Sequence, residues 1–165
     1  MQEENYRYKM RQINSRDDDE MAKIIRLVMP EFGACGPGYA INDPEVDRMF
    51  EAYQSPGAQY YIIEDNGKVV GGGGFGPLSG CDSGYCELQK MYFLKEARGK
   101  GWGRKLLQKC LAEAKKSKYL FCYIETLEGM QQAKKLYVRN GFQKLTSPMG
   151  NTGHFSCNSW YLKKL

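Results

Sequence analysis

The fold is decided by the stretch Arg98-Gly99-Lys100-Gly101-Trp102-Gly103-Arg104, which lies between two apolar segments. Residues 88–94 before it read as a buried strand, and the segment after it carries apolar residues at helical spacing. Three glycines in this stretch leave the first main-chain N–H groups of the helix open to an anion. The helix dipole and the basic residues favour a negative charge at the same place. The stretch therefore predicts a phosphate cradle, with a plain glycine-rich helix cap as the alternative.

The composition is typical of a globular protein, because 42% of the 165 residues are hydrophobic and 26% are charged. This length predicts a single domain, residues 1–165, which can bury a core without metal or disulfide staples. No segment reads as a membrane span, and the polar, acidic start Met1-Gln2-Glu3-Glu4-Asn5 is unlike a secretory signal. We therefore expect a cytoplasmic protein with no membrane partner.

The six cysteines include no Cys-x-x-Cys pair, which predicts reduced thiols that mostly pack in the interior. A zinc site can be drawn from Cys81, Cys86, His154 and Cys157, but these spacings match no structural zinc pattern. We therefore expect no metal. The thiols instead favour a reducing compartment, in agreement with the cytoplasmic expectation.

The net charge of +5 raises the question of a nucleic-acid partner. The basic residues are spread over two expected helices and the last expected strand, which favours a solvated surface over a nucleic-acid interface. We therefore expect no nucleic acid. A nucleic-acid binder remains as an alternative, and it predicts affinity that falls steeply with salt.

The N-terminal third predicts a strand followed by two helices. Residues 6–13, from Tyr6 onward, alternate apolar with basic residues, as in a half-buried strand. Ser15 with Asp18 resembles a capping box for the first helix, which Pro30 ends.

An irregular, glycine-rich segment follows at residues 30–42, and it favours a mobile loop with aromatic contacts. This loop is either part of a substrate pocket or a disordered surface segment. A short second helix is expected over residues 44–53, with Asp43 as its cap.

A β-hairpin is the strongest local signal in the chain. Residues 59–64 and 68–75 read as strands joined by Asp65-Asn66-Gly67, in which asparagine and glycine tolerate positive φ. The segment Gly71–Gly76 matches the dinucleotide pattern Gly-x-Gly-x-x-Gly, but proline follows where a helix would have to begin. We therefore expect these glycines to let a strand bend and pass close to another backbone.

The C-terminal part continues the alternation of strands and helices. Residues 119–126 form a continuous apolar run, which predicts a strand covered on both faces. A helix is expected over 130–139, ended by Asn140-Gly141, and two strands are expected over 142–145 and 155–162.

This succession of elements resembles the GNAT superfamily of acyl-CoA-dependent N-acyltransferases. Arg98, Gly101 and Gly103 fill the family's pyrophosphate-loop pattern, and residues 133–142 look like its Ala-x-x-Leu-Tyr-x-x-x-Gly-Phe segment. The resemblance implies an α/β (α+β) GNAT fold. Such a fold has a mixed central sheet of six to seven strands, about four flanking helices, and a V-shaped splay between the fourth and fifth strands.

The resemblance also implies acetyl-CoA as co-substrate. Residues 98–104 would bind its pyrophosphate through main-chain amides. The main chain of Met91, Tyr92 and Phe93 would contact the thioester carbonyl and the pantetheine arm, and Thr126 would also touch the cofactor. Main-chain donors that are already fixed in place lose little to reorganisation when charge develops.

Two residues carry the chemistry that the resemblance implies. Tyr137 would be the general acid for the thiolate, because a phenol with a pKa of ~10 stays protonated at neutral pH. By periodicity alone Tyr137 shares an apolar helix face, so a core position is the alternative. Glu87 would be the general base for the amine if burial raises its pKa, and a structural partner for arginine or lysine is the alternative.

The resemblance places the acceptor near residues 30–42 and 150–157, with Phe32, Tyr39 and His154 as candidate contacts. His154 reads equally as a surface-loop residue. The implied function is direct transfer of an acetyl group from acetyl-CoA to a primary amine on a small molecule or peptide. A non-catalytic acyl-CoA-binding or regulatory module is the alternative, and the resemblance favours a homodimer.

Overall fold

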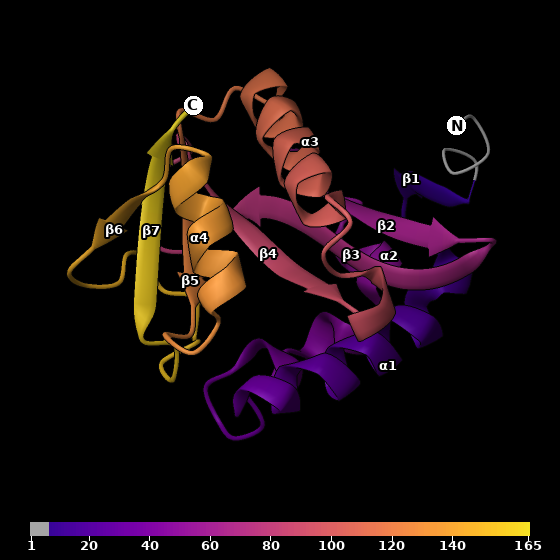
Figure 1. Ribbon diagram of the computed structural model, residues 1–165. Coiled ribbons are helices and arrows are strands. Elements are labelled where there is room, and N and C mark those ends of the chain that lie inside the picture. Colours follow the sequence, from indigo (N-terminus) through magenta and orange to yellow (C-terminus); the bar gives the residue numbers. More distant parts are fainter. Residues whose placement is uncertain (1–6) are drawn as a thin grey trace.

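The computed structural model describes residues 7–165, so Tyr6 of the expected first strand lies outside the described residues. Within this range seven strands form one sheet in the order β1-β2-β3-β4-β5-β7-β6 (Figure 1). The pair β4–β5 is parallel and the other neighbours are antiparallel. The strands are β1 (Tyr8–Gln12), β2 (Gln59–Asp65), β3 (Lys68–Pro77), β4 (Tyr85–Phe93), β5 (Phe121–Thr126), β6 (Gln143–Leu145) and β7 (Ser159–Lys164). The helices are α1 (Asp18–Val28), α2 (Met49–Ala52), α3 (Trp102–Lys116) and α4 (Gln131–Arg139).

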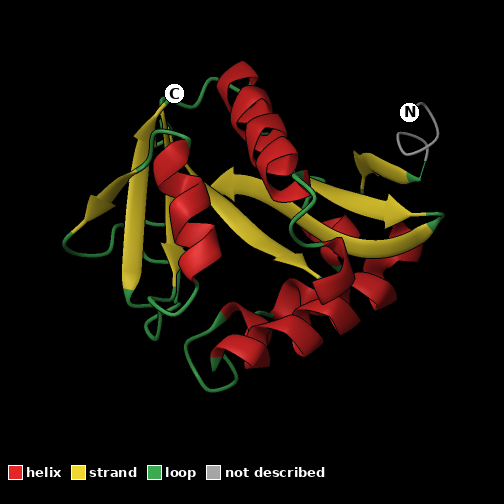
Figure 2. Ribbon diagram, viewed as in Figure 1, coloured by secondary structure: helices red, strands yellow, loops and turns green. Residues whose placement is uncertain are grey.

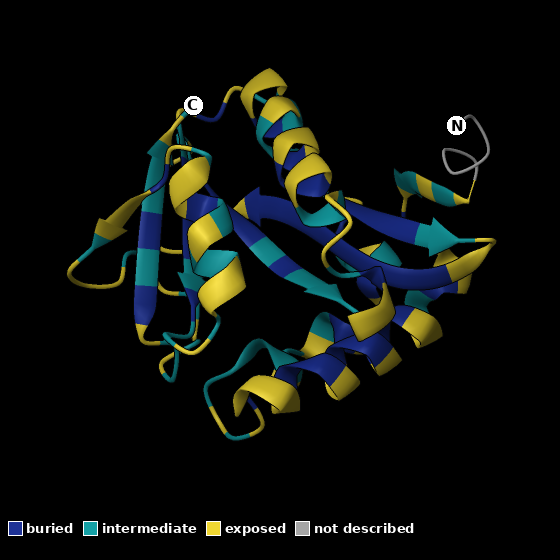
Figure 3. Cartoon of the chain, in the orientation of Figure 1, coloured by how far each residue is buried: buried dark blue, intermediate teal, exposed yellow. Residues whose placement is uncertain are grey.

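Helices cover both faces of the sheet (Figures 1 and 2). Tyr60 and Ile62 of β2 pack in the core cluster under α1, whereas Tyr61 between them packs in the cluster under α3 and α4. Figure 3 shows that β3 is buried along nearly its whole length, whereas β4 contains both buried and partly exposed residues. Burial on both faces explains why β5 reads as a nearly continuous apolar run. No helix in residues 7–165 combines the length and apolar character that a membrane crossing needs.

The predicted hairpin is confirmed, with Asn66 at φ 49° and Gly67 at φ 81° in the turn between β2 and β3. The glycines of β3 lie in a strand that runs on to Pro77, so the rejection of a dinucleotide-binding unit is also confirmed. A Cβ atom on Gly74 would lie 2.3 Å from the carbonyl oxygen of Gln59. Glycine is therefore required there, because the neighbouring backbone leaves no room for a side chain.

The expected cap of the first helix is wrong by one residue. Asn14, not Ser15, accepts a hydrogen bond from the helix start, and Asp17, not Asp18, completes the capping box. The Asp17 carboxylate accepts from the Asn14 main-chain N–H at 2.8 Å and also pairs with Arg11. This ion pair fixes the register of the cap, because it ties the helix start to β1.

The expected helix over residues 44–53 is also wrong in part. The segment forms a 3₁₀ turn, Pro44–Asp47, and then the single turn of α2. Arg48 between them has φ −145° and ψ 50°, which breaks the helical ladder. Asp43 makes no side-chain cap, because its carboxylate binds Lys90 and His154 instead.

The last strand begins at Ser159, four residues later than expected. The preceding segment is held by the loop of residues 30–42 instead. Ser156 donates its main-chain N–H to the carbonyl of Gly38 at 3.2 Å and its hydroxyl to the carbonyl of Pro37 at 2.6 Å. Both segments that were expected to frame an acceptor therefore touch one another.

Candidate active site

A β-bulge in β4 distorts the centre of the sheet. The register between β3 and β4 slips near Gly73, so that Lys90 and Met91 together oppose this one glycine. Lys90 has a left-handed φ of 49°, and the buried hydroxyl of Tyr60 donates to its carbonyl at 2.6 Å. The bulge is thus held by a side chain from β2, two strands away in the sheet, as well as by its own backbone.

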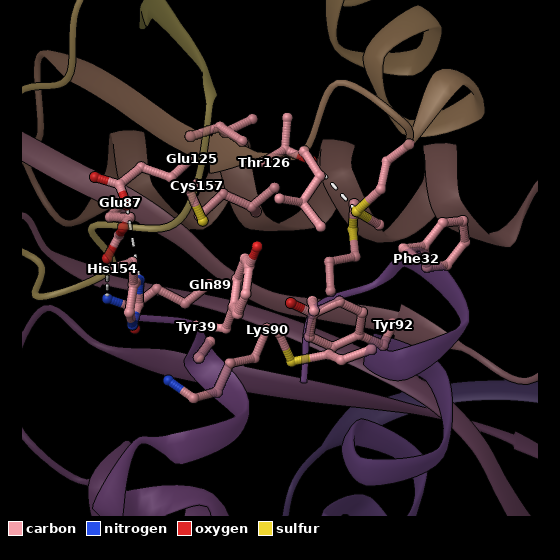
Figure 4. A pocket seen from close by; sticks show the side chains of 18 of the residues that line it. Phe32, Tyr39, Glu87, Gln89, Lys90, Tyr92, Glu125, Thr126, His154 and Cys157 are labelled. Carbon is pink, nitrogen blue, oxygen red and sulfur yellow. Dashed lines mark hydrogen bonds and ion pairs between the residues drawn. The ribbon is translucent and has the colours of Figure 1, made fainter. Parts of the chain in front are cut away.

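The parallel pairing of β4 with β5 is short. It covers only Tyr85–Glu87 opposite Phe121–Tyr123, and the strands then diverge, which confirms the predicted V-shaped splay. A pocket lies beyond the last pair and is walled by β4, β5, the start of α4 and the two loops that touch (Figure 4). Its lining comprises Met29, Phe32, Ala34, Tyr39, Ala40, Glu87, Leu88, Gln89, Lys90, Met91, Tyr92, Ile124, Glu125, Thr126, Leu127, Met130, Tyr137, His154 and Cys157.

The glycine-rich loop forms an open cradle before α3. Gly99 and Gly101 have φ of 73° and 83°, and outside the adjoining residues of the chain no described atom lies within 4 Å of the position that a Cβ atom would take on either. The first N–H groups of α3 have no acceptor inside the helix. A phosphate group therefore fits here, because it supplies the acceptors and the negative charge that this end of the helix favours.

Arg98 adds a second indication of an anion. Its Nε donates to the Phe93 carbonyl at 2.9 Å and its Nη1 pairs with Glu31 at 3.0 Å. Its Nη2 is buried and has no hydrogen-bond partner among residues 7–165. Buried donors are normally paired, so this one indicates a missing acceptor.

The other side chains of the loop turn elsewhere. Lys100 donates to the Tyr8 hydroxyl at 2.7 Å, and the centroids of the Trp102 and Tyr8 rings lie 5.8 Å apart. Gly103 lies close to α4, and Arg104 is exposed in the first turn of α3. The loop thus offers mainly its backbone and Arg98 to a ligand.

Glu87 lies at the point where β4 and β5 part, and the residue is only 6% exposed. Burial raises the pKa of its carboxyl to about 7, helped by the charge of Glu125 and opposed by the Gln89 hydrogen bond and the charges of His154 and Lys90. Gln89 donates to Glu87 at 2.8 Å, and Tyr53 in turn donates to Gln89 at 2.7 Å. Glu87 is thus a positioned carboxyl that changes protonation near neutral pH.

Glu125 and His154 lie beside Glu87, at the same end of the pocket (Figure 4). The Glu125 carboxylate accepts hydrogen bonds from the hydroxyls of Thr152 and Tyr123 at 2.9 Å each. His154 Nδ1 lies 3.8 Å from Glu125, and its Nε2 lies 2.9 Å from Asp43. Burial opposes the imidazolium, but the hydrogen bond and charge of Asp43 raise the pKa of His154 above its ordinary value.

Lys90 lies behind this cluster with a side chain that is 3% exposed. Its ammonium group is 2.8 Å from Asp43 and 3.2 Å from Glu45. Asp43 therefore joins the central strand to the segment that carries His154. These ion pairs hold the two loops against the acceptor end of the pocket.

Tyr137 lines the pocket from α4 and is 5% exposed. Its ring packs against Tyr161 and Phe142, each at 5.9 Å between ring centroids. Its hydroxyl has no hydrogen-bond partner in the described part of the chain. Burial raises the pKa of Tyr137, so the phenol stays protonated at neutral pH. The residue is thus both a core side chain and a free donor at the pocket.

Most of the other predicted site residues also reach this pocket. Phe32, Tyr39 and Thr126 line it together with His154, whereas the Phe93 side chain packs against Gly71 instead. The carbonyl of Phe93 holds Arg98, so Phe93 acts through its main chain.

Four polar residues of the site were missed in the sequence: Asp43, Gln89, Lys90 and Glu125. Glu125 is the one charge in β5, and Lys90 is the second charge in β4 after Glu87, so both could have been recognised from the sequence. A charge on a strand covered on both faces needs a partner or a function.

The described residues contain one group of three side chains placed to share a metal ion, namely Glu87, Glu125 and His154, with ligand atoms within 4.8 Å of one another. The four residues that were considered for a zinc site in the sequence, Cys81, Cys86, His154 and Cys157, do not form such a group in residues 7–165. All six cysteines are free thiols, and Cys86, Cys110 and Cys122 are buried.

Comparisons with known proteins agree with this geometry. The model of the acetyltransferase (GNAT) family matches residues 21–142. The uncharacterized N-acetyltransferase YjgM of Escherichia coli (strain K12) is 40% identical over 157 residues, which cover 94% of each chain.

Solved structures share the fold. A GNAT-family acetyltransferase from Staphylococcus aureus Mu50 has a TM-score of 0.82 at 22% identity, over 95% of this chain and 98% of its own. The acetyltransferase yncA from Salmonella typhimurium, solved with acetyl-CoA, has a TM-score of 0.76 at 21% identity, over 96% and 94%. Because the family match and the fold agree, the chain belongs to the acetyltransferase (GNAT) family and is an acyltransferase.

Proposed function

We propose that this protein is an N-acetyltransferase that moves an acetyl group from acetyl-CoA to a primary amine by direct attack. The observation that carries the proposal is that Glu87 and Tyr137, both buried, line one pocket where β4 and β5 part. The acetyl-CoA bound in the Salmonella typhimurium structure, which has the same fold, supports this donor.

Donor binding would use the backbone more than side chains. The loop of residues 98–104 and the start of α3 would bind the pyrophosphate, with the unpaired Nη2 of Arg98 as an added donor. The main chain of Met91, Tyr92 and Phe93 would bind the thioester carbonyl and the pantetheine arm along the open edge of β4. Thr126 would border the same groove from β5.

Glu87 would be the general base. An amine enters water mostly as an ammonium ion, and it must lose a proton before its nitrogen can attack a carbonyl. A carboxyl with a pKa of about 7 is well matched to this transfer near neutral pH. Gln89 and Tyr53 would hold the carboxyl in one orientation while it gains the proton.

Tyr137 would be the general acid. Attack of the neutral nitrogen forms the C–N bond and breaks the C–S bond, whose electron pair stays on sulfur. The Tyr137 hydroxyl gives its proton to that sulfur, and the second proton lost by the nitrogen restores the hydroxyl. Two protons thus leave the ammonium ion, one to Glu87 and one, through Tyr137, to the thiol.

The remaining parts of the proposal extend the sequence expectations. Tyr39, His154 and Phe32 would contact the acceptor, because all three line the pocket. The centroid of the Phe32 ring also lies 5.8 Å from the Arg98 guanidinium of the donor loop, so it would border the donor as well. The chain would act as one domain in a cytoplasmic homodimer without a metal. Light scattering on the purified protein tests the dimer, because a monomer mass would contradict it.

Release of free thiol from acetyl-CoA in the presence of an amine panel tests the function. We expect Glu87→Gln and Tyr137→Phe each to lower kcat by about 10²–10⁴, the range for loss of a general acid or base. Glu51→Gln and Tyr85→Phe are matched controls outside the pocket and should keep the wild-type rate. Absence of thiol release by the wild type with every amine would contradict the proposal, and an unchanged rate in Tyr137→Phe would remove Tyr137 as the acid.

A further inference from the structure

The acceptor end of the pocket holds two buried carboxyl groups whose hydrogen bonds all come from neutral groups. The Glu87 residue is 6% exposed and the Glu125 side chain is 4% exposed. The Glu125 hydrogen bonds come from the neutral hydroxyls of Thr152 and Tyr123, and the Glu87 hydrogen bond comes from the neutral amide of Gln89. In the described chain the nearest cationic group is His154, 3.8 Å from Glu125.

The other cation of the region is already engaged. The Lys90 ammonium lies between Asp43 and Glu45, at 2.8 Å and 3.2 Å. His154 also contacts Asp43 at 2.9 Å. Even when Glu87 and His154 are both protonated, the three carboxylates of Asp43, Glu45 and Glu125 therefore face only two cationic groups. When Glu87 loses its proton, the excess negative charge grows by one.

Burying this excess charge costs free energy unless a counter-charge arrives. Tyr137 lines the same pocket and is 5% exposed, and no described residue hydrogen-bonds to its hydroxyl, so the pocket also offers a ligand a free donor. The reacting ammonium ion supplies one positive charge, but that charge is lost when its proton moves to Glu87. Glu125 then has only neutral hydroxyls and one imidazole 3.8 Å away, which Asp43 contacts more closely at 2.9 Å.

We infer that the acceptor is an aliphatic diamine or polyamine, whose second ammonium group is bound by Glu125 beside His154. This inference rests on the proposed function, because it assigns the substrate class of the same pocket. An acceptor with a carboxylate at the far end of its chain is disfavoured, since that carboxylate would lie against Glu125.

Three amines with the same four-carbon chain test the inference: 1,4-diaminobutane, 1-aminobutane and 4-aminobutanoate. Their far ends are cationic, neutral and anionic. With the full-length wild type we expect kcat/KM for the diamine to exceed that for the monoamine by at least about tenfold, which corresponds to about 1.4 kcal/mol. We expect 4-aminobutanoate to be the poorest of the three acceptors.

The variant Glu125→Gln keeps the shape of the side chain and removes its charge. We expect the ratio of kcat/KM for diamine over monoamine to fall to about one in this variant, and to stay at the wild-type value in Glu51→Gln, where the changed residue is exposed. The ratio is taken within each protein, so a general loss of activity cancels. The wild-type ratio also stands by itself if Glu125→Gln does not fold.

The outcomes separate this inference from the proposed function. Equal or better use of 1-aminobutane or 4-aminobutanoate would overturn the diamine assignment and leave acetyl transfer intact. An undiminished diamine preference in folded Glu125→Gln would overturn the role of Glu125. No thiol release with any of the three amines would overturn the diamine assignment, and no release with a broader amine panel would overturn acetyl transfer too.

Discussion

Replacement of Glu87 by glutamine tests the electrostatics of the site without any substrate. The Glu87 carboxyl has a pKa of about 7 in the folded protein against an ordinary value of 4.5. The folded state therefore holds a proton that the unfolded chain has lost, and stability falls as pH rises from 4.5 to 7. Glutamine holds no such proton and keeps the hydrogen bond with Gln89.

The size of the effect follows from the two pKa values. Between pH 5 and pH 8 the free energy of unfolding of the wild type should drop, relative to Glu87→Gln, by about 2.5 kcal/mol. Glu125, His154 and Lys90 face Glu87 in both proteins, so the part of their titrations that does not depend on the Glu87 charge cancels in the difference. Urea unfolding of both proteins at the two pH values measures it, with Glu51→Gln as the exposed control.

A difference that stays constant within about 0.5 kcal/mol, the margin within which free-energy changes at independent sites usually add, would refute the raised pKa of Glu87. A difference that changes in the opposite direction would mean that a hydrogen bond or a cation dominates over burial at this carboxyl.

Three further predictions follow from the same structure. The kcat/KM for an amine should rise with pH through an apparent pKa of about 7, since the ionised form of Glu87 is the base, and a flat profile would contradict that role. Gly74→Ala should lower the free energy of unfolding by about 1–3 kcal/mol, because the new Cβ atom would lie 2.3 Å from a backbone oxygen. Gly76→Ala should lower it clearly less, because its Cβ atom would lie 3.4 Å from the nearest atom. Equal urea midpoints for the two variants would contradict this. Tyr60→Phe should lower the free energy of unfolding by about 1–3 kcal/mol and weaken acetyl-CoA binding, because the Lys90 carbonyl at the bulge loses its buried donor. An unchanged affinity in calorimetry would show that the bulge does not contribute to donor binding.

Local sequence patterns were sufficient to predict most of the fold. These patterns depend only on neighbouring residues in the chain. Examples are the turn at Asn66 and Gly67, the apolar run of β5 and the glycines before α3. The prediction of a splay between β4 and β5 rested on the family resemblance and not on any local pattern. It is visible here as parallel pairing that stops after Glu87.

The details that sequence reasoning missed depend on partners far away in the chain. Asp43 reads as a helix cap because aspartate commonly caps, but Lys90 and His154 compete for its carboxylate from 47 and 111 residues away. The cap at Asn14 likewise depends on the ion pair of Asp17 with Arg11 in β1. A single sequence gives the residue types but not these pairings.

The same limit applied to the acceptor end of the pocket. Glu87 was recognised by its place on the central strand, whereas Glu125 was not, although it is a lone charge in a strand buried on both faces. Charged side chains are seldom buried without a partner, so a lone charge in an apolar strand indicates a functional site from the residue pattern itself.

Calorimetric titration of acetyl-CoA tests the central claim most directly, namely that the cradle before α3 and the splayed strands hold this donor. Gly101→Glu puts bulk and negative charge into the cradle at φ 83°, and Gly67→Glu makes the same change at φ 81° in the distant β2–β3 turn. We predict micromolar binding to the wild type and to Gly67→Glu, and none to Gly101→Glu. Absence of binding to the wild type, or equal binding to all three proteins, would contradict the account.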